Sequence, residues 1–254
     1  MIATHEETSI REAHASHREK AQQIIHAAMN EGRGNLLEHE ALHICRLYGI
    51  SAPEFALAEN AQEAERCANN CGYPVALKIV SPDIIHKTEA GGVLIGLDTP
   101  TSVKSSFHEI IDKAKRYKQG VDIRGVLVQK MAPQGIETII GSLKDPQFGQ
   151  TVMFGLGGIL VEMLEDVAFR VVPIDTQDAL QMIHEVKGSA LLKGYRNSPH
   201  ANEEALADAL LRVSALAMDF PEILSIDLNP TVAHSKGISV VDARVIFDKA
   251  VHAT

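Results

Sequence analysis

The chain has few aromatic residues, few cysteines and no excess of positive charge. Tryptophan is absent and aromatic residues make up 4% of the 254 residues, so stacking platforms for single-stranded nucleic acids are scarce. The 24 Lys and Arg residues are outnumbered by 33 Asp and Glu residues, and the resulting formal charge of −9 argues against a nucleic-acid partner. Three cysteines, an odd number in a chain of this size, indicate reduced thiols in a cytoplasmic protein.

Long hydrophobic segments are also lacking. The most apolar stretch runs from Thr151 to Leu164, is shorter than a membrane span and contains Glu162. The N-terminal residues 1–20 are polar and contain no apolar core of a signal peptide. We therefore expect no membrane partner, and a chain long enough for one large domain or two small lobes with buried cores.

Hydrophobic periodicity predicts helices and strands in an irregular order. Helices are expected over 5–31, 35–49, 60–70, 101–117, 177–187 and 203–218, and strands over 55–58, 75–80, 93–97, 125–131, 137–143, 151–154, 167–174, 224–228 and 238–242. The second helix is predicted to start at Asn35, with Glu38 completing a capping box. This order predicts an α+β fold of two lobes around a cleft, with the boundary near Ala132-Pro133, rather than a regular βαβ winding.

Two residues in the first half of the chain are candidates for phosphate chemistry. Lys78 lies inside an otherwise apolar strand, which predicts either a phosphate-binding lysine in a nucleotide cleft or an edge-strand lysine that faces water. The polar loop that follows contains His86 and ends in Gly91-Gly92, whose backbone N–H groups can approach phosphate oxygens. An exposed imidazole there is a candidate nucleophile, although a lone loop histidine is more often a solvated surface residue.

A second candidate region lies at the predicted boundary between the lobes. Gln129 and Met131 end a strand, where backbone groups can meet an adenine edge and an apolar methionine can lie against the ring. Glu137 opens the next strand and can bind ribose hydroxyls or pair with Lys78. The alternative for Glu137 is an ordinary carboxylate at a strand end.

A third candidate region lies near the C-terminus. Ser225, Asp227 and Asn229 alternate with apolar residues and therefore share one face of a strand. Asp242 is placed on a neighbouring strand, and an Asn and an Asp together offer few oxygen ligands. Such a site suits Mg²⁺, which keeps several waters and takes further ligands from substrate phosphates. The alternative is an Asx-Pro turn followed by an aspartate that faces solvent.

Taken in order, segments between about residues 36 and 248 resemble the ATP-grasp domain of the nucleoside-diphosphate-forming acyl-CoA synthetases. The resemblance is to the β subunits of ADP-forming acetate–CoA ligases. The motifs that carry it are Ala76-Leu77-Lys78, Ile85-His86-Lys87 before Gly91-Gly92-Val93, Gln129-Lys130-Met131, Glu137-Thr138-Ile139-Ile140-Gly141, Phe154-Gly155-Leu156-Gly157-Gly158, Asp227-Leu228-Asn229-Pro230 and Val241-Asp242-Ala243.

The resemblance implies the reaction acyl-CoA + ADP + phosphate ⇌ acid + CoA + ATP, through an acyl phosphate and a phosphohistidine. It implies an ATP-grasp domain over 34–254, with lobes over 50–131 and 132–254 around a nucleotide cleft, after an N-terminal helical extension over 1–33. ATP or ADP is then the substrate and Mg²⁺ the cofactor. The implied partner is an α subunit that carries CoA-binding and phosphohistidine domains, in an α2β2 heterotetramer. A succinate–CoA ligase-like β chain and a non-catalytic ATP-binding regulatory subunit are the alternatives.

By position, the resemblance assigns a nucleotide-binding role to four residues. Lys78 would contact the phosphates, where the loop pattern described above also places the N–H groups of Gly91 and Gly92. Gln129 and Met131 would line the adenine site, and Glu137 would reach the ribose side of the nucleotide.

The resemblance also assigns the metal ligands and the relay. Asn229 and Asp242 would hold Mg²⁺, and Asp227 would steady the histidine that delivers phosphate. His86 would match the β-subunit histidine that relays phosphate between the α subunit and ADP. A phosphoryl group needs a carrier between two separated sites, and a histidine on a glycine-flanked loop suits that task.

Overall fold

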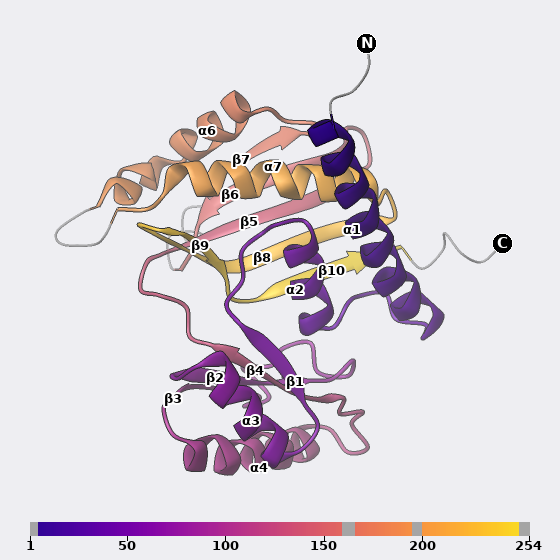
Figure 1. The fold of residues 1–254 in the computed structure, drawn as a ribbon, viewed down its shortest axis with the longest axis vertical. Coiled ribbons are helices and arrows are strands. Elements are labelled where there is room, and N and C mark those ends of the chain that lie inside the picture. Colours follow the sequence, from indigo (N-terminus) through magenta and orange to yellow (C-terminus); the bar gives the residue numbers. More distant parts are fainter. Residues whose placement is uncertain (1–4, 159–165, 195–199, 249–254) are drawn as a thin grey trace. The chain divides into compact units, whose positions relative to one another are not determined.

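The computed structural model describes residues 5–158, 166–194 and 200–248 (Figure 1). The chain divides into two compact units. Unit 1 comprises Met1–Leu36, Glu40–Ala52 and Pro133–Thr254, and unit 2 comprises Leu37–His39 and Pro53–Ala132. Each unit combines helices with an antiparallel sheet, which confirms the predicted α+β class.

Unit 2 is built on a four-stranded antiparallel sheet. Its strands, in spatial order, are β1 (Phe55–Ala58), β4 (Gly125–Lys130), β2 (Val75–Val80) and β3 (Val93–Leu97). Two helices complete the unit, α3 (Ala61–Cys71) and α4 (Pro100–Tyr117). Both helices begin at side-chain caps, since Asn60 accepts a hydrogen bond from the Glu63 N–H, and Thr99 forms a capping box with Ser102.

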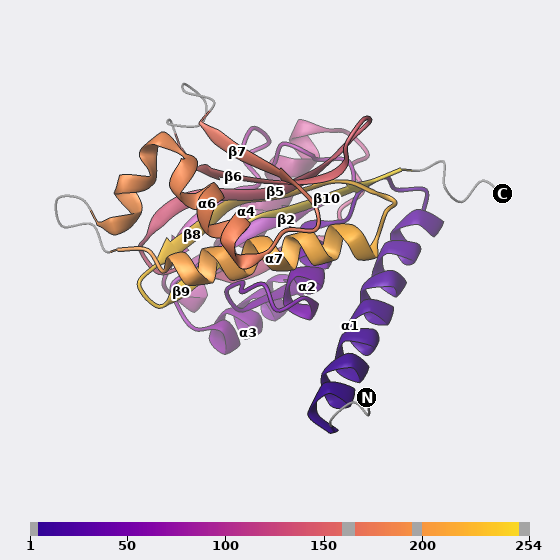
Figure 2. The same cartoon turned by 90° about the horizontal axis from the view of Figure 1, so that it is seen from above.

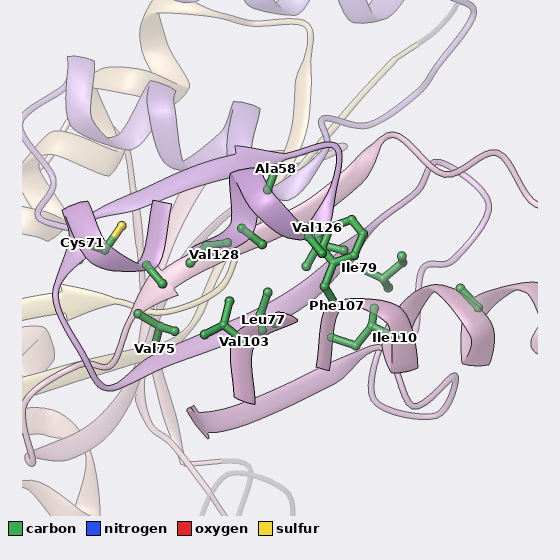
Figure 3. Close-up of a cluster of buried hydrophobic side chains, with 14 of the residues drawn as sticks. Ala58, Cys71, Val75, Leu77, Ile79, Val103, Phe107, Ile110, Val126 and Val128 are labelled. Carbon is green, nitrogen blue, oxygen red and sulfur yellow. The ribbon is translucent and has the colours of Figure 1, made fainter. Parts of the chain in front are cut away.

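The two faces of this sheet carry different side chains. The core lies between the sheet and the two helices, and includes Leu77, Ile79, Val126 and Val128 from the strands and Val103, Phe107 and Ile110 from α4 (Figure 3). Cross-strand register pairs Ala76 with Gln129 and Lys78 with Leu127. Because side chains alternate along a strand, those four residues lie on the face opposite the helices.

Unit 1 is built on a six-stranded antiparallel sheet. Its strands, in spatial order, are β10 (Ala243–Phe247), β8 (Ile223–His234), β5 (Ile136–Asp145), β6 (Gly149–Leu156) and β7 (Val167–Val171), and β9 (Gly237–Val240) pairs with β8. Helix α7 (Glu203–Asp219) runs along one face of this sheet (Figure 2). The other helical elements are α1 (His5–Asn30), α2 (Glu38–Leu47, whose first two residues belong to unit 2), α6 (Thr176–Glu185) and the 3₁₀ helix η1 (Lys187–Lys193).

Helix α1 is attached to unit 1 through its second half. Ala21, Ile25 and Ala28 are fully buried, whereas the side chains over 14–20 are exposed. Within that exposed stretch, Arg18 donates a hydrogen bond to the backbone carbonyl of Asp219 at 3.3 Å. Among the helices that the structure describes, none combines the length and apolar character needed to cross a membrane.

Three predicted elements differ from the structure. The second helix begins at Glu38 and not at Asn35, because residues 35–36 are extended: Asn35 forms a β-bridge with Ile246, and the Leu36 N–H donates to Val245 O at 3.0 Å. The predicted capping box is therefore wrong. Strand β8 continues through Asn229 to His234, so Asn229 is not in a turn. The strand expected over 238–242 ends at Val240, and Asp242 stands between β9 and the unpredicted β10.

The core of unit 2 generates a stability prediction. Ile110 is fully buried between α4 and the sheet, whereas Tyr117, at the end of the same helix, is 52% exposed. Ile110→Ala should lower the free energy of unfolding by about 2–5 kcal/mol, through lost burial and the cavity left behind. Tyr117→Ala should change it by less than about 0.5 kcal/mol. Urea denaturation measures both, and equal effects would contradict the assigned core.

Candidate functional site

The ammonium group of Lys78 is buried against a carboxylate. Its Nζ donates a hydrogen bond to Glu38 Oε1 at 2.6 Å, and the two side chains are only 6% and 4% exposed. Strand β2 lies between β4 and β3, inside the sheet. The alternative of an edge-strand lysine facing water is therefore excluded, and the charge of Lys78 is compensated by Glu38, a partner that the sequence did not predict.

The same carboxylate binds a second lysine. Lys87 Nζ donates to Glu38 Oε2, so one carboxylate bridges two ammonium groups, one from strand β2 and one from the loop after it. Burial by itself raises the pKa of Glu38, but the charges of Lys78 and Lys87 and their hydrogen bonds outweigh it and lower that pKa below its usual value. Two ammonium groups against one carboxylate leave the three side chains formally positive, which favours an anionic ligand.

Glu38 is the main functional residue that the sequence analysis missed. Burial of Lys78 predicted a charge partner, but 33 acidic residues were available to provide it. Glu38 lies 40 positions before Lys78, and its spacing from Asn35 favoured a helix cap instead. The pairing is a long-range contact, which only the fold reveals.

His86 lies exposed on the loop of residues 81–92, which connects β2 to β3. The first part of this loop is anchored through Asp83, whose carboxylate accepts hydrogen bonds from Lys118 Nζ at 2.5 Å and from the Asp122 N–H at 2.8 Å. The neighbouring Ile85 is 58% exposed. His86 is thus exposed to solvent on a loop whose first part is anchored through Asp83. A nucleophile must be accessible in this way.

The paired glycines close the other end of this loop. The Gly91 N–H donates to Thr88 O at 3.0 Å and the Gly92 N–H to Lys87 O at 2.7 Å. A Cβ atom at Gly92 would lie 2.4 Å from Ile79 Cγ2, so only glycine fits there. Both N–H groups already donate hydrogen bonds inside the loop, so either would have to exchange or share its acceptor to bind a phosphate oxygen. Their contact with phosphate stays a prediction.

Gln129 has a buried donor without a partner. Its side chain lies on the Lys78 face of the sheet and is 1% exposed, and no hydrogen-bond acceptor for Nε2 is found in the part of the chain that the structure describes. A buried unsatisfied donor costs about 1–3 kcal/mol, so an acceptor on a ligand would be favourable here. Met131 is half-buried beyond the strand, and its N–H donates to Pro74 O at 3.0 Å.

The C-terminal candidates come together in unit 1. Asp227 on β8 lies opposite Arg244 on β10, and the Asn229 N–H donates to Asp242 O at 3.2 Å. The structure therefore places Asn229 beside Asp242, as predicted. Arg244 was missed as a neighbour of Asp227 because β10 was not predicted.

Acidic groups crowd this region. Burial raises the pKa of Asp227, the negative charge of Asp242 raises it further, and the charge of Arg244 only partly opposes them. Carboxylate and amide oxygens are suitable Mg²⁺ ligands. Within the described ranges, no three His, Cys, Asp or Glu side chains are arranged to hold a metal ion. A cation bound by Asn229 and Asp242 would therefore need oxygens from another source, such as a phosphate.

Glu137 lies on β5 with its side chain exposed, beneath a glycine turn. The Gly157 N–H donates to Glu137 O at 2.7 Å, and a Cβ atom at Gly157 would lie 2.8 Å from Glu137 Cβ. The glycines thus allow close approach to Glu137. Pairing of Glu137 with Lys78 was one expectation, but the structure gives Lys78 the partner Glu38.

The sequence pattern assigns no role to Glu162 or Arg170, and of the two the structure describes only Arg170. Arg170 forms an exposed ion pair with Glu185 at 2.7 Å, which gives it a structural contact on the surface. Glu162 lies outside the described residues.

Crowding around Asp227 generates a prediction with a defined sign. Because the folded state raises the pKa of Asp227, its ionisation costs stability, and that cost appears as the pH rises through the folded pKa. Asp227→Asn should therefore raise Tm at pH 7 by about 1–4 °C and have less effect near pH 3.5. Thermal unfolding at the two pH values measures this difference. A lower Tm of the variant at pH 7 would contradict it.

Comparisons with known proteins identify the family of the chain. The profile of the ATP-grasp domain family matches residues 27–247. The chain is 48% identical over 228 residues to the acetate–CoA ligase [ADP-forming] I subunit beta of Pyrococcus furiosus, with 90% of this chain and 98% of that protein covered. It is 42% identical over 234 residues to the acetate–CoA ligase [ADP-forming] I of Archaeoglobus fulgidus, covering 92% of this chain but 34% of that longer protein.

Solved structures extend the comparison to the fold. Acetyl-coenzyme A synthetase 1 of Ca. Korarchaeum cryptofilum, in complex with coenzyme A, Ca-AMPCP and HgCl+, matches with a TM-score of 0.88 and 46% identity, over 90% of this chain and 100% of that one. A structure of the same synthetase with coenzyme A and Mg-AMPPCP, and a phosphohistidine segment pointing towards the nucleotide binding site, matches at 0.80 and 44% identity over the same shares. The chain has an ATP-grasp fold and belongs to the β-subunit family of the ADP-forming acetate–CoA ligases.

Proposed function

We propose that this chain is the nucleotide-binding subunit of an ADP-forming acyl-CoA synthetase, with the reaction acyl-CoA + ADP + phosphate ⇌ acid + CoA + ATP. Its own step is phosphoryl transfer between ADP or ATP and a histidine relay. The observation that carries the proposal is the buried Lys78 ammonium, held by Glu38 beside the loop that presents His86. Identity of 48% to a named β subunit along most of the chain supports it.

The nucleotide-binding roles follow from charge and hydrogen-bonding capacity. Lys78 supplies a desolvated cation for phosphate oxygens, where electrostatic attraction is stronger than in water. Gln129 offers its Nε2 donor to the base or sugar, and Met131 an apolar surface to the ring. Glu137 offers an exposed carboxylate that can accept hydrogen bonds from ribose hydroxyls.

Metal binding is assigned to unit 1. Asn229 and Asp242 would hold Mg²⁺ by side-chain oxygens, as their adjacent backbones allow. When bound, Mg²⁺ neutralises phosphate charge. Asp227, ionised with difficulty beside Asp242, would accept a hydrogen bond from the histidine that delivers phosphate and so orient its ring.

The transfer step places His86 as the nucleophile. A lone pair of its imidazole nitrogen attacks the γ-phosphorus of ATP and forms a P–N bond. The bond from that phosphorus to the β,γ-bridging oxygen breaks, and ADP leaves with the electron pair. The reverse step returns the phosphoryl group to ADP. Positioning and cationic stabilisation by Lys78 supply the catalysis.

The acyl-CoA chemistry is assigned to a partner. The relative from Pyrococcus furiosus is named as a β subunit, and the relative from Archaeoglobus fulgidus is almost three times as long as the part that this chain matches. Both facts support an α subunit that carries the CoA-binding and phosphohistidine domains. We infer an α2β2 heterotetramer as the working assembly.

Labelling by ATP tests this function. In the complex purified with its partner, [γ-³²P]ATP and Mg²⁺ should label this chain with acid-labile, base-stable phosphate. His86→Ala should remove at least about 95% of that label, because the nucleophile is gone. His108→Ala, which changes another exposed histidine of unit 2, should leave it unchanged. Gel separation of the subunits followed by peptide mapping locates the phosphate.

The outcomes separate the alternatives. Full label in the His86→Ala variant would exclude the relay. ATP binding by the wild-type complex with no label and no acyl-CoA-dependent ATP synthesis would favour the non-catalytic ATP-binding subunit.

A further inference from the structure

We propose that Glu38 is a positioning residue that couples the loop of residues 81–92, which carries His86, to Lys78. The inference rests on the proposed function, since the step it serves is phosphoryl transfer to His86. Glu38 has no role of its own in the transfer step described above. One buried carboxylate links the strand that holds the phosphate-binding cation to the loop that holds the nucleophile.

The two ends of this link are unequal. Lys78 belongs to β2, which is hydrogen-bonded on both sides inside the sheet and cannot shift alone. Lys87 belongs to the loop and is the residue directly after His86. Because Glu38 gives one oxygen to each lysine, the position of Lys87 is set relative to Lys78. The backbone beside His86 is thereby held against the sheet.

Two other anchors of the loop, at Asp83 and at Gly92, lie farther from His86 in the sequence than Lys87 does. Asp83, three residues before His86, accepts hydrogen bonds from the side chain of Lys118 and from the backbone N–H of Asp122. Gly92 is bonded back to the carbonyl of Lys87. Between Asp83 and that turn, the ion pair of Lys87 with Glu38 is a partly buried side-chain contact made by the residue next to His86. Placement of a nucleophile to within a fraction of an ångström strongly affects transfer rates.

Loss of the carboxylate has a specific consequence. Without it, the buried ammonium of Lys78 and the partly buried ammonium of Lys87 would lose the carboxylate that separates their like charges, and they would repel each other. The residue free to move is Lys87, so the loop should detach while the sheet persists. A phosphate could still bind Lys78, and with less competition, because Glu38 no longer holds that ammonium. The variant should thus separate nucleotide binding from transfer.

The test uses Glu38→Gln in the complex with its partner. We expect the rate of His86 phosphorylation at saturating ATP, measured by rapid quenching, to fall at least about tenfold. The Kd for ATP should stay within about threefold of wild type or tighten. Glu38→Asp, which keeps the charge on a shorter side chain, should recover part of the rate. Lys87→Met breaks only the loop side of the bridge and should lower the rate as Glu38→Gln does.

A matched control lies on the same helix. Glu40 binds Arg33 through two hydrogen bonds of 2.7 and 2.8 Å, so Glu40→Gln also removes a partly buried ion pair. Its phosphorylation rate at saturating ATP should equal that of the wild type. Amide hydrogen exchange provides a second readout, because residues 84–88 should exchange faster in Glu38→Gln than in Glu40→Gln.

Each outcome decides one claim. An unchanged phosphorylation rate and unchanged exchange over 84–88 in Glu38→Gln would overturn the coupling. Loss of ATP binding in parallel with the rate would also overturn it, since Glu38 would then serve binding. Absence of label in the wild type would instead refute the proposed function. Faster exchange in Glu38→Gln would in that case still support the link between Glu38 and the loop.

Discussion

One buried carboxylate organises the chemistry of unit 2. A lysine inside a sheet is stable only when its charge is compensated, and Glu38 provides that compensation for Lys78. Its second oxygen binds Lys87 and so determines where the loop with His86 lies. The proposed phosphate-binding cation and the proposed nucleophile therefore both depend on Glu38, a residue that need not touch the substrate. The Gln129 side chain lies on the same face of the sheet, and its buried Nε2 donor has no acceptor among the described residues.

Unit 1 carries the opposite electrostatic character at its candidate residues. Burial raises the pKa of Asp227 above its usual value; the charge of Arg244 lowers it without cancelling that effect, and the charge of Asp242 raises it slightly further. Keeping a buried carboxylate ionised costs stability, and the metal site proposed at Asn229 and Asp242 would place a compensating positive charge close to it. Taken separately, the cluster of unit 2 is positively charged and suits phosphate oxygens, and the candidate residues of unit 1 offer oxygen ligands that suit a divalent cation.

Local patterns predicted most of what local forces determine. Lys78, Asn229 and Asp242 stood out because polar residues interrupt apolar strands, and the structure places Lys78 in a buried ion pair and Asn229 beside Asp242. Glu38 could not be predicted, because its partners lie 40 and 49 positions away and its local spacing favoured a helix cap. Strand β10 is not predictable from the local pattern, because the carboxylate of Asp242 is typical of a strand end, whereas the chain begins a new strand at Ala243 directly after it.

A crystal structure of the complex with its partner, grown with Mg²⁺ and a non-hydrolysable ATP analogue, tests the central claim most directly. The account predicts a phosphate oxygen within hydrogen-bonding distance of Lys78 Nζ, an acceptor of the nucleotide on Gln129 Nε2, and Mg²⁺ bound by Asn229 and Asp242. A nucleotide bound elsewhere, with Lys78 in contact with Glu38 but with no phosphate oxygen, would contradict it.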